Sequence, residues 1–506
     1  MSRLDDLATV TFARELVPVL ATAPPSDSFG RAGGEAMPFL HRWLGNPLFS
    51  AMARRLSIWR SSMRRYDLLA VLILAAALRF LLLLLWLPEL TGDEVDYDRL
   101  ARSLIDGRGY ISPRGEPTSL RPPLYPAFVA AGYALSGGAV QAVRFLQATL
   151  DVGTVALTYL IGRWLFGRGP GLLAALLLSV NLGMVAATGR LLSETLFTFL
   201  LIAAVAVTVE WLRAMREGRV QAVVALGIGI GVLLGAATLT RGILLLYTVP
   251  LIVLAAWTRW VHEPASGWVP SAPALRKATW GAILAVLVTF ALVLTPWTLR
   301  NYRVHGAFVP VTTQSGIALY ASYNPPKGIF GLLRRDEVTA AAEHLREPEA
   351  SAALVRAAVD SIYTSPGKAL KLEALKVLYF WAPLDWEILP FSGAFNPAYA
   401  FIAIWSLFYV ALRLPRENSP PTWPAWLPIL YFFGMALLFH GSPRYRLPVE
   451  PLLALFAAMG LATLDQRVGR RISSVLVGGT MVFLLLVCAF SEPLKHLAKG
   501  WIFGLW

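Results

Sequence analysis

Residues 67–88 read DLLAVLILAAALRFLLLLLWLP, a stretch made almost entirely of apolar side chains. About 20 apolar residues in a helix match the roughly 30 Å hydrocarbon core of a bilayer, so this stretch is predicted to be a transmembrane helix. Arg64 and Arg65 precede it, and Asp93 and Glu94 follow it. Because basic residues gather in cytoplasmic loops, the N-terminus is predicted to be cytoplasmic and the segment after the helix external.

Similar apolar stretches recur along the chain. They lie near 142–164, 171–189, 191–212, 221–239, 242–258, 278–298, 397–413, 425–440, 447–464 and 473–490. Only 15% of all residues are charged, against roughly 25% in soluble domains. The predicted fold class is therefore an all-α polytopic membrane protein with about eleven transmembrane helices, placed in the inner (plasma) membrane.

The positions of basic residues agree with a single assignment of cytoplasmic and external sides to the connections between these spans. The connections predicted to be cytoplasmic contain Arg163 and Arg168; Arg213, Arg216 and Arg219; Arg259, Arg276 and Lys277; Arg413 and Arg416; Arg467, Arg470 and Arg471. We expect residues 1–65 to form a cytoplasmic tail with a basic membrane-surface segment. Residues 66–492 are then the transmembrane domain, and 493–506 a short external tail. Within the domain, two long external segments are predicted, at about 89–140 and 300–395.

The external segments are predicted to contain helices of their own. Apolar residues recur at spacings of three and four in 94–105, and a proline pair opens a second helix that ends near Leu135. Both are expected to lie along the membrane interface. The second segment has a helical pattern at 336–360. Residues 369–383 of this segment are apolar enough to touch or enter the membrane. If they crossed it fully, the number of spans and the predicted orientation of all later spans would change.

Composition also excludes several classes of function. The net charge is +14, but the basic residues form short clusters between apolar runs rather than one patch, which argues against a nucleic-acid partner. The single cysteine, Cys488, excludes an intrachain disulfide. No P-loop, GxSxG, HExxH or CxxC pattern occurs. The sequence thus favours a lipid-linked substrate over a soluble nucleotide.

Two adjacent acids open the first external segment. The carboxylates of Asp93 and Glu94 can accept a proton from a hydroxyl or hold a cation. The alternative interpretation is that they are solvated interfacial acids. Asp96 and Asp98 are interpreted as the solvated face of the following helix.

External arginines are the second group of candidates. Arg121 stands before Pro122 and Pro123, so a stiff turn presents its guanidinium, which can grip a phosphate with two hydrogen bonds. Arg190 and Glu194 lie four residues apart in a tight turn, where the alternative is a structural ion pair.

Two further runs add external arginines. RNYRVHG contains Arg300 and His305, and HGSPRYRLP contains Arg444, Tyr445 and Arg446. External loops normally carry few positive charges, so the group favours a phosphate-bearing ligand over contact with lipid headgroups. The histidines form no metal motif. Three other charged residues are interpreted as structural: Arg144, Asp151 and Arg241.

In five motifs the chain resembles the C-type (GT-C) polytopic glycosyltransferases, in the bacterial branch similar to dolichyl-phosphate-mannose–protein mannosyltransferases and to aminoarabinose and lipopolysaccharide-core transferases. The motifs are TGDEVDYDRLARSLIDGRGY (91–110), RPPLYP (121–126), GRLLSETLF (189–197), RNYRVHGAFVPVTT (300–313) and RYRLPVEPLLAL (444–455). The chain departs from the aminoarabinose subtype in one place. In that subtype an acid directly precedes the basic residue that corresponds to Arg121, whereas here that position is Leu120. Glu116 is the nearby candidate substitute.

The resemblance implies sugar transfer from a polyprenyl-phosphate donor at the external face, with Asp93 as catalytic base and Glu94 as its neighbour. The residues expected to bind the donor phosphate are Arg121, Arg190, Arg300, Arg444 and Arg446. Those expected to contact substrate are Glu194, Tyr97, Tyr125, Tyr445 and His305. No cofactor or metal site is expected, although a divalent cation stays open. The partners expected are the donor, membrane lipids and a glycan, lipid or protein acceptor.

A phosphate leaving group needs no general acid, so a single displacement with inversion at the anomeric carbon is expected. Two alternatives stay open. A ligase or polymerase of lipid-linked glycans would use a polyprenyl diphosphate donor. A secondary transporter would show repeats and charges near the midplane, whereas here repeats are absent and most charges cluster at the external ends of the spans.

Overall fold

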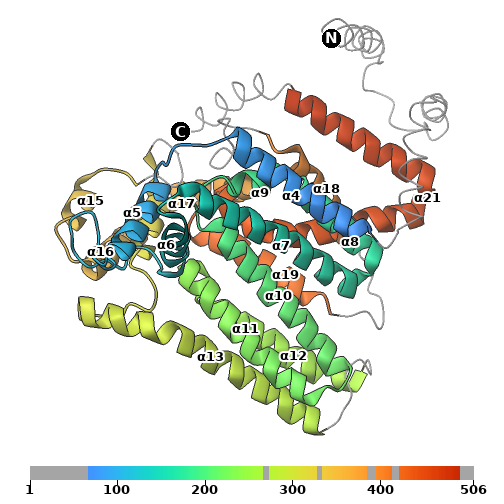
Figure 1. Ribbon diagram of the computed structural model, residues 1–506, viewed down its shortest axis with the longest axis horizontal. Helices are drawn as coiled ribbons and strands as arrows, with labels where there is room; N and C mark the ends of the chain where they lie inside the picture. The colour runs from blue at the N-terminus through green and yellow to red at the C-terminus, as the bar shows by residue number, and fades with distance from the viewer. Residues whose placement is uncertain (1–65, 266–272, 327–332, 384–394, 413–420, 490–506) are drawn as a thin grey trace, which may run out of the picture. The chain divides into compact units, whose positions relative to one another are not determined.

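The computed structural model describes residues 66–265, 273–326, 333–383, 395–412 and 421–489. These residues are predominantly helical (Figure 1). Apart from helices and turns, they contain one isolated antiparallel bridge, between Ile111 and Pro117. The predicted tails at 1–65 and 493–506 lie outside the described residues. The all-α fold class is confirmed.

Most of the apolar sequence forms a bundle of helices. In chain order these are α4 (Asp67–Leu85), α7 (Val140–Phe166), α8 (Arg168–Ser179), α9 (Leu182–Ala187), α10 (Glu194–Arg216), α11 (Val220–Thr240), α12 (Thr248–Ala265), α13 (Pro273–His305), α18 (Pro397–Leu412), α19 (Trp423–Leu438) and α21 (Glu450–Ala489). Among the described residues, six helical stretches are long and apolar enough to cross a membrane: α4, α7, α10, α11, α13 and the stretch that contains α21. Each predicted span overlaps one of the bundle helices, and the count of about eleven stays a prediction.

A glycine explains how two predicted spans share one helical element. Gly469 has φ +78° inside α21, a conformation that costs glycine little and other residues much. The helix therefore changes direction there, which Figure 1 shows as two arms. The two arms correspond to the predicted spans at 447–464 and 473–490.

The predicted external segments carry shorter helices. These are α5 (Asp93–Ile105), α6 (Leu124–Ser136), α14 (Ser315–Tyr323), α15 (Glu337–Ala342), α16 (Glu347–Thr364) and α17 (Pro366–Trp381). The short helix α20 (Pro443–Arg446) lies in the connection between α19 and α21. The helical pattern at 336–360 is two helices rather than one, because Asp336 caps α15 and a proline in the first turn begins α16. Among the described helices, α17 does not reach the length and hydropathy of the six candidate spans.

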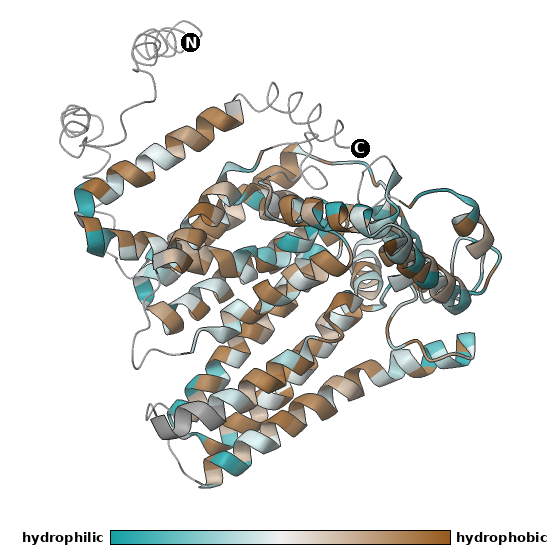
Figure 2. Ribbon diagram, turned by 180° about the vertical axis from the view of Figure 1, so that it is seen from behind, coloured by the Kyte–Doolittle hydropathy of each residue, from teal (hydrophilic) through white to brown (hydrophobic). Residues whose placement is uncertain are grey.

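Helix packing brings distant segments together. α11 packs along α13, α18 along α21, and α10 against both α7 and α11. Apolar side chains dominate these long helices, whereas α5 is largely hydrophilic (Figure 2). The helices α5, α6, α15 and α16 gather at one end of the bundle, opposite the α7–α8 connection and the bend of α21 (Figure 1).

Two contacts fix the N-terminal part of the bundle. Between α7 and α8, a Cβ added to Gly162 would lie only 2.6 Å from Cα of Gly171, so the backbones touch. Between α4 and α7, Arg79 Nε donates to Asp151 Oδ2 at 2.5 Å, with both side chains buried. Arg79 also donates to the carbonyl of Ser179. A charge in an apolar bundle is expensive unless it is paired, which agrees with the structural interpretation of Asp151.

Candidate active site

Asp93 lies between two arginines that come from distant parts of the chain. Its helix, α5, begins directly after Gly92, whose φ of +53° turns the chain out of the preceding loop. One carboxylate oxygen of Asp93 accepts a hydrogen bond from Arg121 Nη2 at 2.6 Å, and the other from Arg444 Nη1 at 3.2 Å. The side chain is still 33% exposed, so an incoming molecule can reach it.

A second carboxylate, that of Glu194, lies behind this pair. Arg444 Nε donates to Glu194 Oε1 at 2.7 Å, and Arg241 Nη1 lies 2.7 Å from the same oxygen as an ion pair outside hydrogen-bond geometry. Glu194 is almost fully buried, at 1% exposed. Arg444 therefore bridges the partly exposed Asp93 and the buried Glu194.

The electrostatics of Asp93 favour its ionised form. Burial alone would raise the pKa of the carboxyl, but the charges and hydrogen bonds of Arg121 and Arg444 outweigh it and hold the pKa below its usual range. The carboxylate is thus charged at neutral pH and able to accept a proton. As long as both arginines stay on it, it is a weak base.

Arg121 contacts a second acid and an aromatic ring. Its Nη2 also donates to Asp96 Oδ2 at 2.9 Å, and its guanidinium lies over the ring of Tyr97, 5.4 Å from the centroid. Tyr97 in turn packs edge-on against Tyr125, whose hydroxyl donates to Gln147 Oε1. These contacts hold the guanidinium beside Asp93.

Glu94, the neighbour of Asp93, points into the protein. It is fully buried and accepts hydrogen bonds from the backbone N–H of Leu191 at 2.8 Å and of Thr91 at 3.2 Å. Arg190 Nη2 lies 2.8 Å from Oε2, the oxygen that also accepts from the N–H of Thr91. Glu94 and Arg190 thus tie the start of α5 to the turn before α10.

Two buried donors in the cluster have no protein partner in the described part of the chain. The Nε–H groups of Arg121 and Arg190 are buried, and neither has a hydrogen-bond partner among the described residues. A buried donor left unpaired costs about 1–3 kcal/mol.

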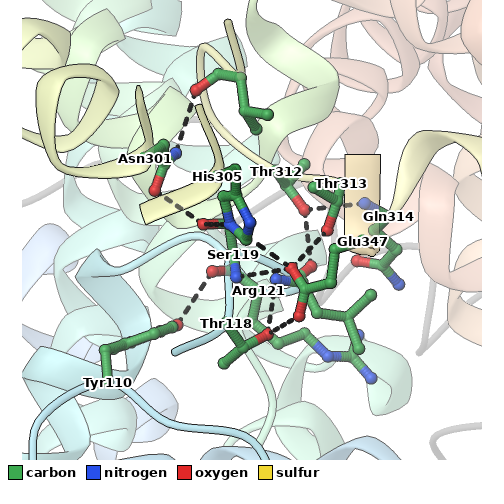
Figure 3. A network of polar contacts seen from close by, with 12 residues as sticks. Tyr110, Thr118, Ser119, Arg121, Asn301, His305, Thr312, Thr313, Gln314 and Glu347 are labelled. Atoms are coloured by element: carbon green, nitrogen blue, oxygen red, sulfur yellow. Dashed lines mark hydrogen bonds and ion pairs between the residues drawn. The ribbon is translucent and has the colours of Figure 1, made fainter. Parts of the chain in front are cut away.

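Arg300 and His305 belong to a second polar network; Figure 3 shows the part of it around His305 and Ser119. Arg300 Nη1 donates to the carbonyl of Thr118 at 2.7 Å, and its guanidinium lies 4.7 Å from the ring centroid of Trp297. His305 Nε2 lies 2.8 Å from the hydroxyl of Ser119. The network surrounds the backbone that leads into Arg121.

The remaining predicted residues take other places. Arg446 is fully buried, donates to Glu450 at 2.8 Å and to the carbonyl of Phe380 at 2.8 Å. Tyr445 packs against His440 with ring centroids 5.7 Å apart, and Arg241 lies over its ring at 5.3 Å. Tyr445 therefore adjoins the arginine cluster, whereas Arg446 joins α17 of the second external segment to the start of α21.

Among the described residues, no three His, Cys, Asp or Glu side chains are grouped so that they could hold a metal ion. The carboxylates of Asp93 and Asp96 face guanidinium groups instead. Glu116, the candidate substitute for an acid before Arg121, is exposed, and Asp93 and Asp96 supply acids that contact Arg121.

Three residues that the sequence does not assign to the site contact its members. The pattern favours a solvated position for Asp96 and a structural role for Arg241, and it gives no signal for Glu347. The predicted alternation of spans already put Arg241 at the external end with Arg190 and Arg444, so topology was a signal that could have found it. Nothing local to Asp96 or Glu347 distinguishes them from surface acids.

A family model matches part of the chain. Residues 120–297 match the family model described as dolichyl-phosphate-mannose-protein mannosyltransferase. No curated protein matches the chain in sequence.

Solved structures extend the similarity over most of the chain. One is the oligosaccharyltransferase AglB from Archaeoglobus fulgidus in complex with an inhibitory peptide and a dolichol-phosphate (TM-score 0.52, 14% identity, 85% of this chain and 56% of that chain). A second structure of the Archaeoglobus fulgidus oligosaccharyltransferase, in complex with Zn and sulfate, gives a TM-score of 0.54 at 15% identity over 84% of this chain and 52% of that chain.

The third is ArnT from Cupriavidus metallidurans bound to undecaprenyl phosphate, with a TM-score of 0.51 and 16% identity over 82% of this chain and 64% of that chain. The chain thus spans about half the length of the archaeal enzymes and less than two thirds of ArnT. Together with the apolar helices, these similarities indicate a multi-pass membrane protein. The chain has the fold of the GT-C polytopic membrane glycosyltransferases, the class that its sequence motifs resemble.

Proposed function

We propose that the protein is an inverting glycosyltransferase, which moves a sugar from a polyprenyl-phosphate donor to an acceptor hydroxyl at the external membrane face. The observation that carries the proposal is the position of Asp93, partly exposed and held between Arg121 and Arg444. A base for the acceptor and cations for the leaving group are the two elements that such a transfer requires.

The reaction follows from these charges. The phosphate of the donor takes the place of the Asp93 carboxylate on Arg121 and Arg444. Freed from its cations, Asp93 becomes a stronger base and accepts the proton of the acceptor hydroxyl. The hydroxyl oxygen forms a bond to the anomeric carbon while the bond from that carbon to the phosphate oxygen breaks. The departing polyprenyl phosphate gains one negative charge, which the guanidinium groups stabilise.

The donor class is supported by the solved relatives, whose structures contain dolichol-phosphate in AglB and undecaprenyl phosphate in ArnT. The family model matched by residues 120–297 concerns a dolichyl-phosphate-mannose enzyme. The proposed partners are a polyprenyl-phosphate sugar and a glycan, lipid or protein acceptor, with no cofactor required.

The test compares purified wild-type protein with Asp93→Asn in membranes that carry polyprenyl-phosphate sugars, and measures release of free polyprenyl phosphate. We expect the variant to lose about 10²–10⁴-fold in rate, the usual contribution of a general base. Asp98→Asn is the matched control, because Asp98 lies on the same helix but binds Arg102 and Tyr133.

Three outcomes separate the alternatives. Release that depends on Asp93 and not on Asp98 supports the transferase. Release of polyprenyl diphosphate from diphosphate-linked glycans would favour the ligase or polymerase. No release from any donor, with Asp93→Asn folded and indistinguishable from wild type, would favour the transporter.

A further inference from the structure

The short segment 118–122, which leads into and includes Arg121, is held along its backbone by the second external segment. The carbonyl of Ser119 accepts from the N–H of Thr313 at 3.1 Å, and the carbonyl of Leu120 accepts from the hydroxyl of Thr312 at 2.6 Å. Arg300 donates to the carbonyl of Thr118. These partners lie at the end of α13 and in the turn that follows.

Glu347 is the centre of this attachment, as Figure 3 shows. One carboxylate oxygen accepts from the hydroxyl of Thr118 at 2.5 Å. The other accepts from the N–H of Ser119 at 2.8 Å and from the hydroxyl of Thr313 at 3.0 Å. Both oxygens are thus occupied, and the start of α16 is joined to the segment two and three residues before Arg121.

The Ser119 side chain is fixed as well. Its hydroxyl donates to Asn301 Oδ1 at 2.7 Å and lies 2.8 Å from His305 Nε2. His305 Nε2 is also 3.8 Å from the carboxylate of Glu347. With the side chain and backbone of Ser119 both held, the segment has little freedom to shift relative to α13 and α16.

On the far side of Arg121, the hydroxyl of Tyr110 donates to the carbonyls of Arg121 at 2.9 Å and Pro122 at 3.1 Å. The guanidinium of Arg121 then extends to Asp93 and Asp96. The backbone on both sides of Arg121 is therefore held, while its charged end is the part that meets a ligand.

We infer that Glu347 is a positioning residue for Arg121: by holding segment 118–122, the second external segment sets where the Arg121 guanidinium lies relative to Asp93. The inference rests on the proposed function for its kinetic consequence. A displacement of about 1 Å in a catalytic group can cost on the order of 10²-fold in rate, so loss of the Glu347 carboxylate should be visible in turnover.

The test is a double-mutant cycle on release of polyprenyl phosphate. We expect Arg121→Ala to lower kcat/KM about 100-fold, as removal of one charge-stabilising donor does. Glu347→Ala is expected to lower it about tenfold, and Glu347→Gln, which keeps one acceptor oxygen, by less. Because Glu347 acts through Arg121, the double variant should be no worse than Arg121→Ala alone. Independent losses that multiply to about 1,000-fold would overturn the inference, as would wild-type kinetics in Glu347→Ala.

Glu349→Gln is the matched control, since Glu349 lies in the same first turn of α16 but forms an exposed ion pair with Arg346. Hydrogen exchange provides a second measurement, which is independent of catalysis. The amide of Ser119 should exchange faster in Glu347→Gln than in wild type or Glu349→Gln. If wild type releases no polyprenyl phosphate, the proposed function fails, and unchanged exchange at Ser119 would then refute the positioning role on its own.

Discussion

Asp93 and Arg444 are 351 residues apart in the chain, and their side chains form an ion pair of 3.2 Å. Arg444 continues from there to the buried Glu194, so one guanidinium links the first external segment to the start of α10. The partly exposed carboxylate that we assign as base is thus part of an ionic chain that reaches into the protein.

The pH dependence of activity should reveal the cations beside Asp93. Since its pKa is held below the usual range, Asp93 stays ionised as pH falls toward 4, and kcat/KM should show no acid limb from this group in that region. Arg121→Gln removes one of the positive charges that lower the pKa of Asp93. The pKa of Asp93 then rises, and an acid limb should appear at higher pH. Profiles of kcat/KM, which report the free enzyme, provide the measurement. An acid limb that is the same in both proteins would argue against Asp93 as the base.

Glu194 should matter for stability as well as chemistry. Glu194→Gln leaves Arg241 and Arg444 facing each other without their shared counter-charge. Breaking a buried pair costs about 3–5 kcal/mol, so thermal unfolding in detergent should shift clearly downward. Glu210→Gln on the same helix is the control, because Glu210 is in an exposed ion pair worth about 0–1 kcal/mol. Equal stability of the two variants would contradict the assigned role of the pair.

The buried pair of Arg79 and Asp151 gives a test of non-additivity. Asp151→Leu alone leaves the Arg79 charge buried, and Arg79→Met alone leaves the Asp151 charge buried, so each should destabilise by about 3–5 kcal/mol. The double variant replaces the pair by apolar side chains and should recover most of the loss. Unfolding midpoints of the four proteins decide the question, and simple addition of the two losses would show that the pair does not act as a unit.

Close backbone contact between α7 and α8 predicts a steric effect. In Gly171→Ala, the new Cβ would lie 2.7 Å from Arg163 N and 2.8 Å from Tyr159 O, so the helices must separate. We expect a loss of about 1–3 kcal/mol, as for other overpacked sites. Gly434→Ala in α19 is the control, since its Cβ would meet no atom within 4 Å. It should be neutral or stabilising by up to about 1 kcal/mol.

Labelling can test which end of the bundle faces outward. In a Cys488→Ser background, Arg108→Cys places a thiol in the exposed turn after α5, and Arg216→Cys places one at the end of α10. In intact cells a membrane-impermeant maleimide should label only residue 108. Labelling of residue 216 alone would reverse the proposed orientation.

Periodicity and hydropathy were sufficient to predict most of the fold. The apolar runs are helical, although 171–189 is divided between α8 and α9 and two runs share α21. The stripe at 94–105 is α5, with Tyr97, Leu100 and Ala101 buried. Ile105 is the exception, at 43% exposed, because it lies at the last turn of the helix. Such patterns depend on neighbours three or four positions away, which the sequence contains directly.

The pairing of charges was harder to predict, because it depends on contacts across hundreds of positions. Asp93 and Arg121 were predicted as site residues, yet nothing in the sequence showed that they touch. Arg241 contacts Glu194 only through the packing of α10 and α11. Likewise, the run that contains Arg300 predicts an external cation. The sequence does not show that Arg300 donates to the carbonyl of Thr118, because the two residues are 182 positions apart.

The ion pair between Asp93 and Arg444 also has a consequence for biosynthesis. A ribosome adds about 5–20 residues per second, so Asp93 leaves it on the order of tens of seconds before Arg444 does. During that interval the nascent protein already has the early helices in the membrane but lacks the arginine that completes the ionic chain. On the proposed function, newly made copies would therefore be inactive until almost the whole polypeptide has been inserted.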